Sequence, residues 1–224
     1  MHPRRLTVIF VAQDPARLAQ FWAGVLGRPV IADAEDGQLG LRFVPGGGQK
    51  HGPNRMHPHL TSTSLADQQH TVTTALELGA RHLDVGQRPE EGHVVLADPE
   101  GNEFCVIEPD NAFLAGCGLL GELTCDGTRA VGLFWSRALG WPLVWDQGEE
   151  TAIQSPRGGT KVSWSGDRPM TFETVRQRFA LTAPDGDRAA EVDRLVSLGA
   201  MRLEAGDDGV LADPDGSEFR VLTT

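Results

Sequence analysis

Two pairs of side chains at alternating positions could carry chemistry in this sequence. His57 and His59 are separated by one residue, and so are Glu103 and Cys105. Because successive side chains of a β-strand point to opposite faces, each pair shares one face if its segment is a strand. An imidazole can bind a metal ion, contact a ligand or act as a base. Both histidines could instead be structural. Cys105 could act as a nucleophile or be a small buried thiol.

A second set of candidates lies in the C-terminal part of the chain. Arg220, together with Glu122 or Glu218, could anchor a polar ligand or form an internal ion pair. Trp145 and Trp164 could stack on a flat ligand or pack in the core. The candidate ligand-binding residues are therefore His57, His59, Glu103, Cys105, Glu122, Gln177, Glu218, Arg220, Trp145 and Trp164.

The segments that position these residues alternate between strand-like and helix-like patterns. Asp14 and Pro15 predict the start of a helix that ends at Gly27, and Asp67 predicts the cap of a second helix that ends at Gly79. The turn residues Asp98-Pro99-Glu100-Gly101 predict a hairpin. The strands are expected near 6–11, 38–45, 57–63, 82–85, 94–97 and 103–108.

The whole pattern occurs twice. Leu96–Val106 recurs as Leu211–Val221, Phe21-Trp22 recurs as Phe134-Trp135, and Leu78-Gly79-Ala80 recurs as Leu198-Gly199-Ala200. Three matched blocks in the same order predict two copies of one domain, over residues 1–112 and 119–224, linked through Asp110–Gly118. Each copy contains two β-α-β-β-β units, so the chain contains four.

These motifs resemble the vicinal oxygen chelate superfamily, and most closely its glyoxalase-like domain group. The residues that carry the resemblance are Asp14-x6-Phe21-Trp22-x3-Leu26-Gly27, Asn54-Arg55-Met56-His57, Leu78-Gly79-Ala80-Arg81 and Asp98-Pro99-Glu100-Gly101-Asn102-Glu103-Phe104-Cys105. The resemblance implies an α+β fold in which the four βαβββ modules form two cupped-sheet domains. We expect each copy to form its own cup, with Gln177 and Phe179 on the concave face of the second.

The same resemblance suggests where a divalent metal ion would bind, on the first and last strands of each unit. The corresponding residues here are Thr7, His57, Cys105, Leu120, Gln177 and Arg220. Zinc and iron sites need about three protein ligands with one position left open, and this set does not supply them. We therefore expect no cofactor, and place any divalent ion that does bind near His57 or His59.

Two functions of different classes follow from the resemblance. The first is a metal-free protein that binds a small organic molecule, as bleomycin-resistance proteins sequester a cationic drug, and the bound compound would be cationic or aromatic. The alternative is an enzyme (a lyase, isomerase or dioxygenase) with an atypical site in the first domain. A third possibility is a degenerate relative that acts through protein contacts.

Composition excludes several other classes. The chain has 20 Lys and Arg against 31 Asp and Glu, a net charge of −11, which disfavours binding to nucleic acid. It has no apolar run of membrane-spanning length and no signal-peptide pattern. Three irregularly spaced cysteines do not form a disulfide framework. We expect a cytoplasmic monomer or homodimer, whose acidity either keeps it soluble or favours a cationic ligand.

Overall fold

The structure is a computed structural model that describes residues 4–30, 38–46, 50, 52–88, 90–166, 176–184, 187–203 and 209–223. Its helices are α1 (Pro15–Leu26), α2 (Leu65–Glu77), α3 (Arg129–Leu139) and α4 (Arg188–Ser197). Its strands are β1 (Arg5–Ala12), β2 (Gly40–Pro45), β3 (Met56–Leu60), β4 (Arg81–His82), β5 (Val94–Ala97), β6 (Glu103–Val106), β7 (Leu120–Asp126), β8 (Leu143–Gln147), β9 (Glu150–Ile153), β10 (Lys161–Ser165), β11 (Gln177–Thr182), β12 (Met201–Arg202), β13 (Val210–Ala212) and β14 (Glu218–Leu222).

The element order confirms the α+β class and the four modules. Each module consists of a strand, a helix and further strands, and the modules begin at β1, β3, β7 and β11. In the first module one strand, β2, follows the helix within the described residues. The second and fourth modules share a short strand and a hairpin after the helix, as the repeated sequence blocks predict.

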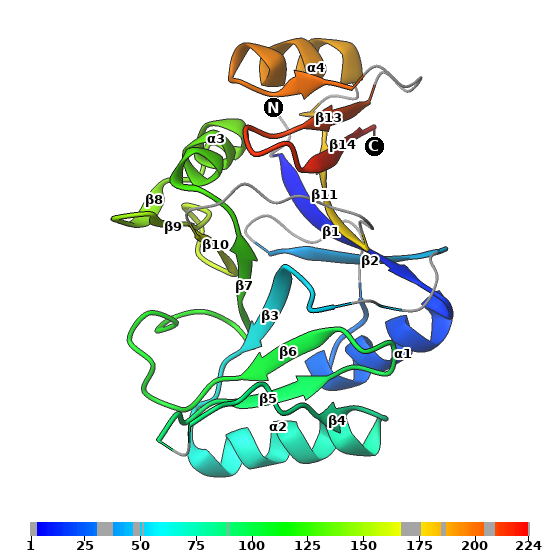
Figure 1. The fold of residues 1–224 in the computed structure, drawn as a ribbon, viewed down its shortest axis with the longest axis vertical. Coiled ribbons are helices and arrows are strands. Elements are labelled where there is room, and N and C mark those ends of the chain that lie inside the picture. The colour runs from blue at the N-terminus through cyan, green and yellow to red at the C-terminus, as the bar shows by residue number, and fades with distance from the viewer. Residues whose placement is uncertain are drawn as a thin grey trace.

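The two sheets combine strands from both copies of the repeat (Figure 1). One sheet has the order β12-β13-β14-β11-β1-β2, and the other has the order β4-β5-β6-β3-β7-β10-β9-β8. Strand β1 is antiparallel to β11, and β3 is antiparallel to β7. The first module is thus paired with the fourth and the second with the third. Our expectation that each copy forms its own cup is wrong.

In the part of the chain that the structure describes, helices cover one face of each sheet and leave the other face free. Val8 and Phe179 are paired across β1 and β11, and both belong to the apolar core beneath the helices. Their neighbours Thr7 and Ala180 point to the opposite face because strand side chains alternate. We call the helix-free face of the eight-stranded sheet the eight-strand cup, and that of the six-stranded sheet the six-strand cup.

A buried aspartate explains why the Asp-Pro-x-Gly block recurs. The indole Nε1 of Trp22 in α1 donates to Asp98 Oδ2 at 3.2 Å, and the backbone N–H groups of Glu100 and Asn102 each donate to Asp98 Oδ1 at 2.9 Å. The Glu100 carboxylate accepts hydrogen bonds from the backbone of Gln13 and Asp14. The turn thus connects the two modules of one copy, and its recurrence reflects the fold rather than catalysis.

The helix ends agree with the sequence signals, with one exception. The Asp14 side chain accepts from Arg17 N, and Gly27 ends α1 in the left-handed region at φ 62°. In α2 the cap is Ser64 and not Asp67. Asp67 instead accepts hydrogen bonds from the backbone and hydroxyl of Thr63, the residue before the cap. Within the described ranges, every helix is too short or too polar to cross a membrane.

Candidate functional site

The eight-strand cup carries two rows of polar side chains that cross neighbouring strands. In the first row Cys105 of β6, His59 of β3, Glu122 of β7 and Lys161 of β10 occupy paired positions. In the second row His57, Thr124 and Ser163 are paired across β3, β7 and β10. Strand pairing across the two copies therefore brings His59 and Glu122 together, although they are far apart in the sequence.

Glu122 lies at the centre of a hydrogen-bond network. Its Oε2 is 2.8 Å from His59 Nδ1, and its Oε1 accepts a hydrogen bond of 2.5 Å from the Ser163 hydroxyl. Only 7% of Glu122 is exposed. A buried carboxylate needs such partners because isolated burial of its charge is costly.

The two histidines of the cup have opposite protonation tendencies. Burial alone would lower the pKa of His59, but hydrogen bonds with Cys105 and Glu122 and the Glu122 charge raise this pKa to about 9. Burial lowers the pKa of His57, which the Glu103 charge only partly offsets. Among the described residues, the buried Nε2 of His57 has no hydrogen-bond partner. At neutral pH the cup therefore combines a charged donor with a neutral imidazole.

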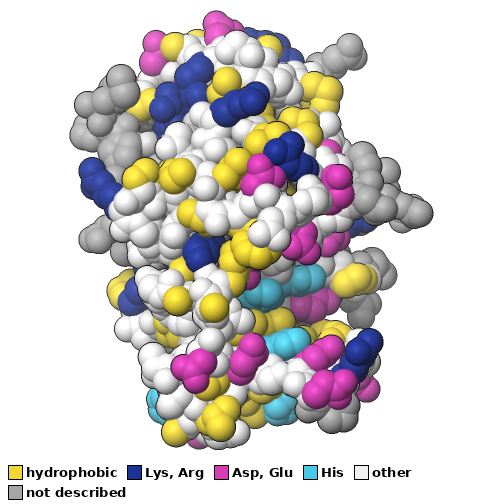
Figure 2. Space-filling model, turned by 90° about the vertical axis from the view of Figure 1, so that its left-hand side faces the viewer, with side chains coloured by type: hydrophobic (Ala, Val, Ile, Leu, Met, Phe, Trp, Pro, Cys, Tyr) yellow, Lys and Arg dark blue, Asp and Glu magenta, His cyan; other side chains and the backbone are white. Residues whose placement is uncertain are grey.

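Glu103 lies at one end of this face and is also paired. Lys50 forms an ion pair with its Oε1, and the backbone N–H of Asn54 donates to its Oε2 at 3.1 Å. Lys50 and Glu103 line one wall of an open cleft of about 580 Å³ near the Asp98 turn. Figure 2 shows a hollow about halfway along the molecule, with histidine and acidic side chains gathered beside it.

Aromatic side chains lie at the far edge of the eight-stranded sheet. Trp145 of β8 is 38% exposed and packs edge-on against Phe113 of the linker, with ring centroids 6.2 Å apart. The Lys161 ammonium lies 4.5 Å from the centroid of the Phe113 ring. Trp145 is paired with Ala152, and Ala152 with Ser163, so the tryptophan follows the second polar row. This edge offers an aromatic surface to a flat ligand.

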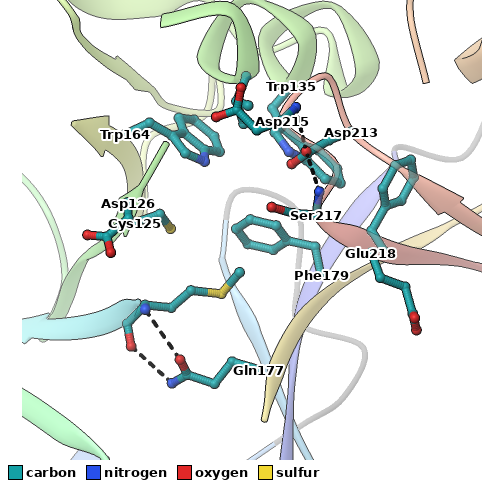
Figure 3. Close-up of a pocket in the computed structure, with 13 residues that line it drawn as sticks. Cys125, Asp126, Trp135, Trp164, Gln177, Phe179, Asp213, Asp215, Ser217 and Glu218 are labelled. Atoms are coloured by element: carbon teal, nitrogen blue, oxygen red, sulfur yellow. Dashed lines mark hydrogen bonds between the residues drawn. The ribbon is translucent and has the colours of Figure 1, made fainter. Parts of the chain in front are cut away.

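Two expected site residues lie in the interior instead. Gln177 hydrogen-bonds to the backbone N and O of Met56, and Trp164 is 2% exposed. Both line the cavity between the sheets that Figure 3 shows, together with Phe179 and Asp213. This cavity measures about 10 Å³, room for roughly one water molecule and no organic ligand.

The error in placing Gln177 is a one-residue shift in register. Phe179 is paired with Val8 on the core face, so Gln177 and Phe179 face the core while Arg178 and Ala180 face the cup. A one-residue shift moves every side chain of a strand to the other face. Leu120 also packs in the core, because the pairing of β3 with β7 shifts after His59.

The remaining candidates, Glu218 and Arg220, lie on the six-strand cup. Arg178, which the sequence analysis missed, forms an ion pair of 2.8 Å with Glu218. Ser163 and Lys161 were also missed. They alternate with the apolar Val162 and Trp164 in the sequence, and this alternation was the available signal.

The donor set does not fit a divalent metal ion. The possible donors that lie together in the eight-strand cup are His59, Cys105, Glu122 and Ser163. Glu122 Oε2 and His59 Nδ1 already form a hydrogen bond with each other, and Glu122 Oε1 already accepts one from Ser163. In the part of the chain that the structure describes, no three His, Cys, Asp or Glu side chains are arranged to hold an ion.

Comparisons with known proteins agree with this architecture. The model of a family described as glyoxalase-like domain matches residues 7–107 and again residues 122–222. Glyoxalase I from Zea mays has a similar structure, with a TM-score of 0.65, 13% identity, and coverage of 97% of this chain and 92% of that one. A candidate dioxygenase from Bacillus subtilis has a TM-score of 0.56, 15% identity, and coverage of 97% and 84%. No curated protein matches the chain.

Proposed function

This chain belongs to the glyoxalase-like domain family, and from that premise we propose that it binds a small organic molecule in the eight-strand cup without a metal ion. The observation that carries the proposal is the paired row of His59 and Glu122 beside His57, whose Nε2 has no partner among the described residues. An unsatisfied buried polar atom is costly, and a ligand that hydrogen-bonds to it removes this cost.

The charges of the cup favour an aromatic ligand over a cationic one. Glu122 is paired with His59, and Glu103 is paired with Lys50, so these two carboxylates are already neutralised. Neither of them therefore offers an unpaired negative charge to a cation. Trp145 and Phe113 supply a surface on which a ring can pack.

Fluorine NMR with a set of uncharged, cationic and anionic fluoroaromatic fragments tests the proposal. We expect an uncharged aromatic fragment to bind, and His57→Ala or Trp145→Ala to weaken its binding by about 5- to 50-fold. His70→Ala, at an exposed position on α2, is the matched control. If the wild type and the three variants bind the fragment equally well, the fragment does not bind in the eight-strand cup.

Elemental analysis of protein purified without a tag tests the metal-free part of the proposal. We expect no stoichiometric zinc, iron, nickel or manganese. About one equivalent of metal that disappears in His59→Ala would overturn it, because a structural or catalytic ion needs such a ligand.

One observation favours a second function, that of an enzyme with an atypical site. His59 and Glu122 form a proton-holding pair in the cup, as general acid–base catalysis requires. Fragments that bind should then be tested for turnover. Activity abolished by Glu122→Gln, with binding retained, would establish the enzyme.

A further inference from the structure

The six-strand cup carries a cluster of arginines. Arg42 of β2 and Arg178 of β11 flank Ile9 of β1 in paired positions across three strands. Arg220 of β14 is paired with Ala180, one row away on the same face. Such diagonal neighbours on adjacent strands lie within reach of long side chains. The fold thus brings together three guanidinium groups from distant parts of the sequence.

The charge of this face is opposite to that of the molecule. Among the strand residues that the structure describes, the three arginines share the face with one acidic side chain, Glu218, while the chain as a whole carries a net charge of −11. Arg178 NH1 donates to Glu218 Oε1 at 2.8 Å, which neutralises one of the three. Arg42 and Arg220 have no ion-pair partner within the described ranges. Local positive charge in an acidic protein concentrates anions at that place.

Hydrogen-bond donors on this face also lack partners. The Nε atoms of Arg178 and Arg220 are buried, and neither has an acceptor among the residues described. A guanidinium presents its N–H groups as a planar fork that matches the two oxygens of a carboxylate or phosphate. Thr7, Ile9 and Ala180, on the same face, are buried, so the bed of the cluster is largely apolar.

We infer that the six-strand cup binds a small organic oxyanion, an apolar body bearing a carboxylate or a phosphate group, through Arg220 and Arg178. The anionic group replaces the missing acceptors of the two guanidiniums, and Arg42 adds charge from the exposed edge strand. This site is separate from the eight-strand cup and does not depend on the function proposed above.

Fluorine NMR titration at low ionic strength tests the inference with three probes. Para-fluorobenzoate carries a carboxylate, para-fluorophenyl phosphate carries a phosphate, and para-fluorobenzyl alcohol is the uncharged control with the same ring. We expect at least one anionic probe to bind about tenfold more tightly than the alcohol. Comparison of the two anions tells which oxyanion the site prefers.

The variants give effects of opposite sign. Arg220→Gln and Arg178→Gln should each weaken binding of the anion by about tenfold or more. Glu218→Gln frees Arg178 and should tighten binding by roughly fivefold, which a variant that merely disturbs folding does not do. The control is Arg137→Gln, at an exposed position at the end of α3. It changes the net charge by the same amount as Arg220→Gln and Arg178→Gln and should have no effect on anion binding.

Two results would overturn the inference. One is that neither anion binds more tightly than the alcohol. The other is that binding is the same in Arg220→Gln, Arg178→Gln and Arg137→Gln. If Arg220→Gln does not fold, Arg220→Lys replaces it, because lysine keeps the charge without the planar fork. The inference is then contradicted if both Arg220→Lys and Glu218→Gln bind the anions with the affinity of the wild type.

Discussion

At the scale of single residues, His59 and Glu122 act as one electrostatic unit. The pKa of His59 is about 9 in the folded protein and close to 6.5 in an unfolded chain, so the folded state binds the proton more tightly. The stability that this pair contributes is fully present below about pH 6.5 and is lost as the pH rises through about 9.

We expect Glu122→Gln to reduce this pH dependence, because the hydrogen bond and the charge of Glu122 no longer raise the pKa of His59, while the hydrogen bond with Cys105 remains. The loss of unfolding free energy should reach about 2–3 kcal/mol near pH 6 and become smaller at pH 9. Urea denaturation at several pH values measures it, and NMR titration of the imidazole gives the pKa directly. A His59 pKa that stays near 9 in the variant would contradict the pairing.

Asp213, in the second turn of the repeat, should also lose its contribution to stability as the pH rises, which is the reverse of the usual behaviour of a carboxyl group. Burial raises its pKa to about 6, while hydrogen bonds from the backbone of Ser217 and Asp215 oppose the shift. Because the folded pKa exceeds the unfolded value of about 4, this group favours the folded state at low pH and loses that contribution as the pH rises through 6.

Asp213→Asn should therefore abolish a pH-dependent part of the stability. The asparagine oxygen still accepts from the backbone of Asp215 and Ser217 but cannot ionise. Relative to the variant, the wild type should lose about 2–3 kcal/mol of unfolding free energy between pH 4 and pH 8. If the unfolding free energies of the wild type and the variant differ by the same amount at every pH in this range, the carboxyl is not buried as described.

At the scale of elements, two glycines inside helices differ in how much space surrounds them for a larger side chain. A Cβ on Gly132 of α3 would lie 1.9 Å from Oγ1 and 2.7 Å from Cβ of Thr151, which is buried in β9. A Cβ on Gly24 of α1 would meet Leu78 Cδ1 at 2.6 Å, the end of a partly exposed and flexible side chain.

We predict that Gly132→Ala destabilises the protein by about 1–3 kcal/mol through overpacking. Gly24→Ala should be neutral or stabilising by up to about 1 kcal/mol, because alanine favours a helix over glycine. Urea denaturation of both variants makes the comparison. Equal effects would mean that α3 and β9 are not in this contact.

The elements themselves could be predicted from local patterns, and their face assignments only in part. The capping residue Asp14, the terminal Gly27 and the turn at Asp98 are signals that act within a few residues. The side on which Gln177 lies depends on the register between β11 and β1, which nothing near Gln177 encodes. The shifted pairing beyond His59 displaced Leu120 for the same reason.

At the scale of the whole molecule, the repeat was visible in the sequence but the pairing of its modules was not. The recurring Trp22 and Asp98 contact each other within one copy, so they report on local architecture. The edges of β1 and β3 could in principle accept a strand from either copy. Only the three-dimensional arrangement decides that β11 and β7 occupy them.

Separate expression of residues 1–112 and 119–224 tests this pairing. Each piece alone leaves the edges of two central strands unpaired, and such edges cause self-association or aggregation. We expect the pieces to fold into a stable complex only when they are produced together, which co-purification through a tag on one piece detects. A monomeric, cooperatively unfolding 1–112 fragment would contradict the cross-copy sheets.

The pairing of modules across the copies also bears on how such a protein can diverge after gene duplication. Recombination that replaces the second copy changes four strands of the eight-stranded sheet and four of the six described strands of the other sheet in one event. A conventional tandem protein would instead exchange one complete site and keep the other. Inheritance of the two cups is therefore linked, and new combinations of residues arise in both at once.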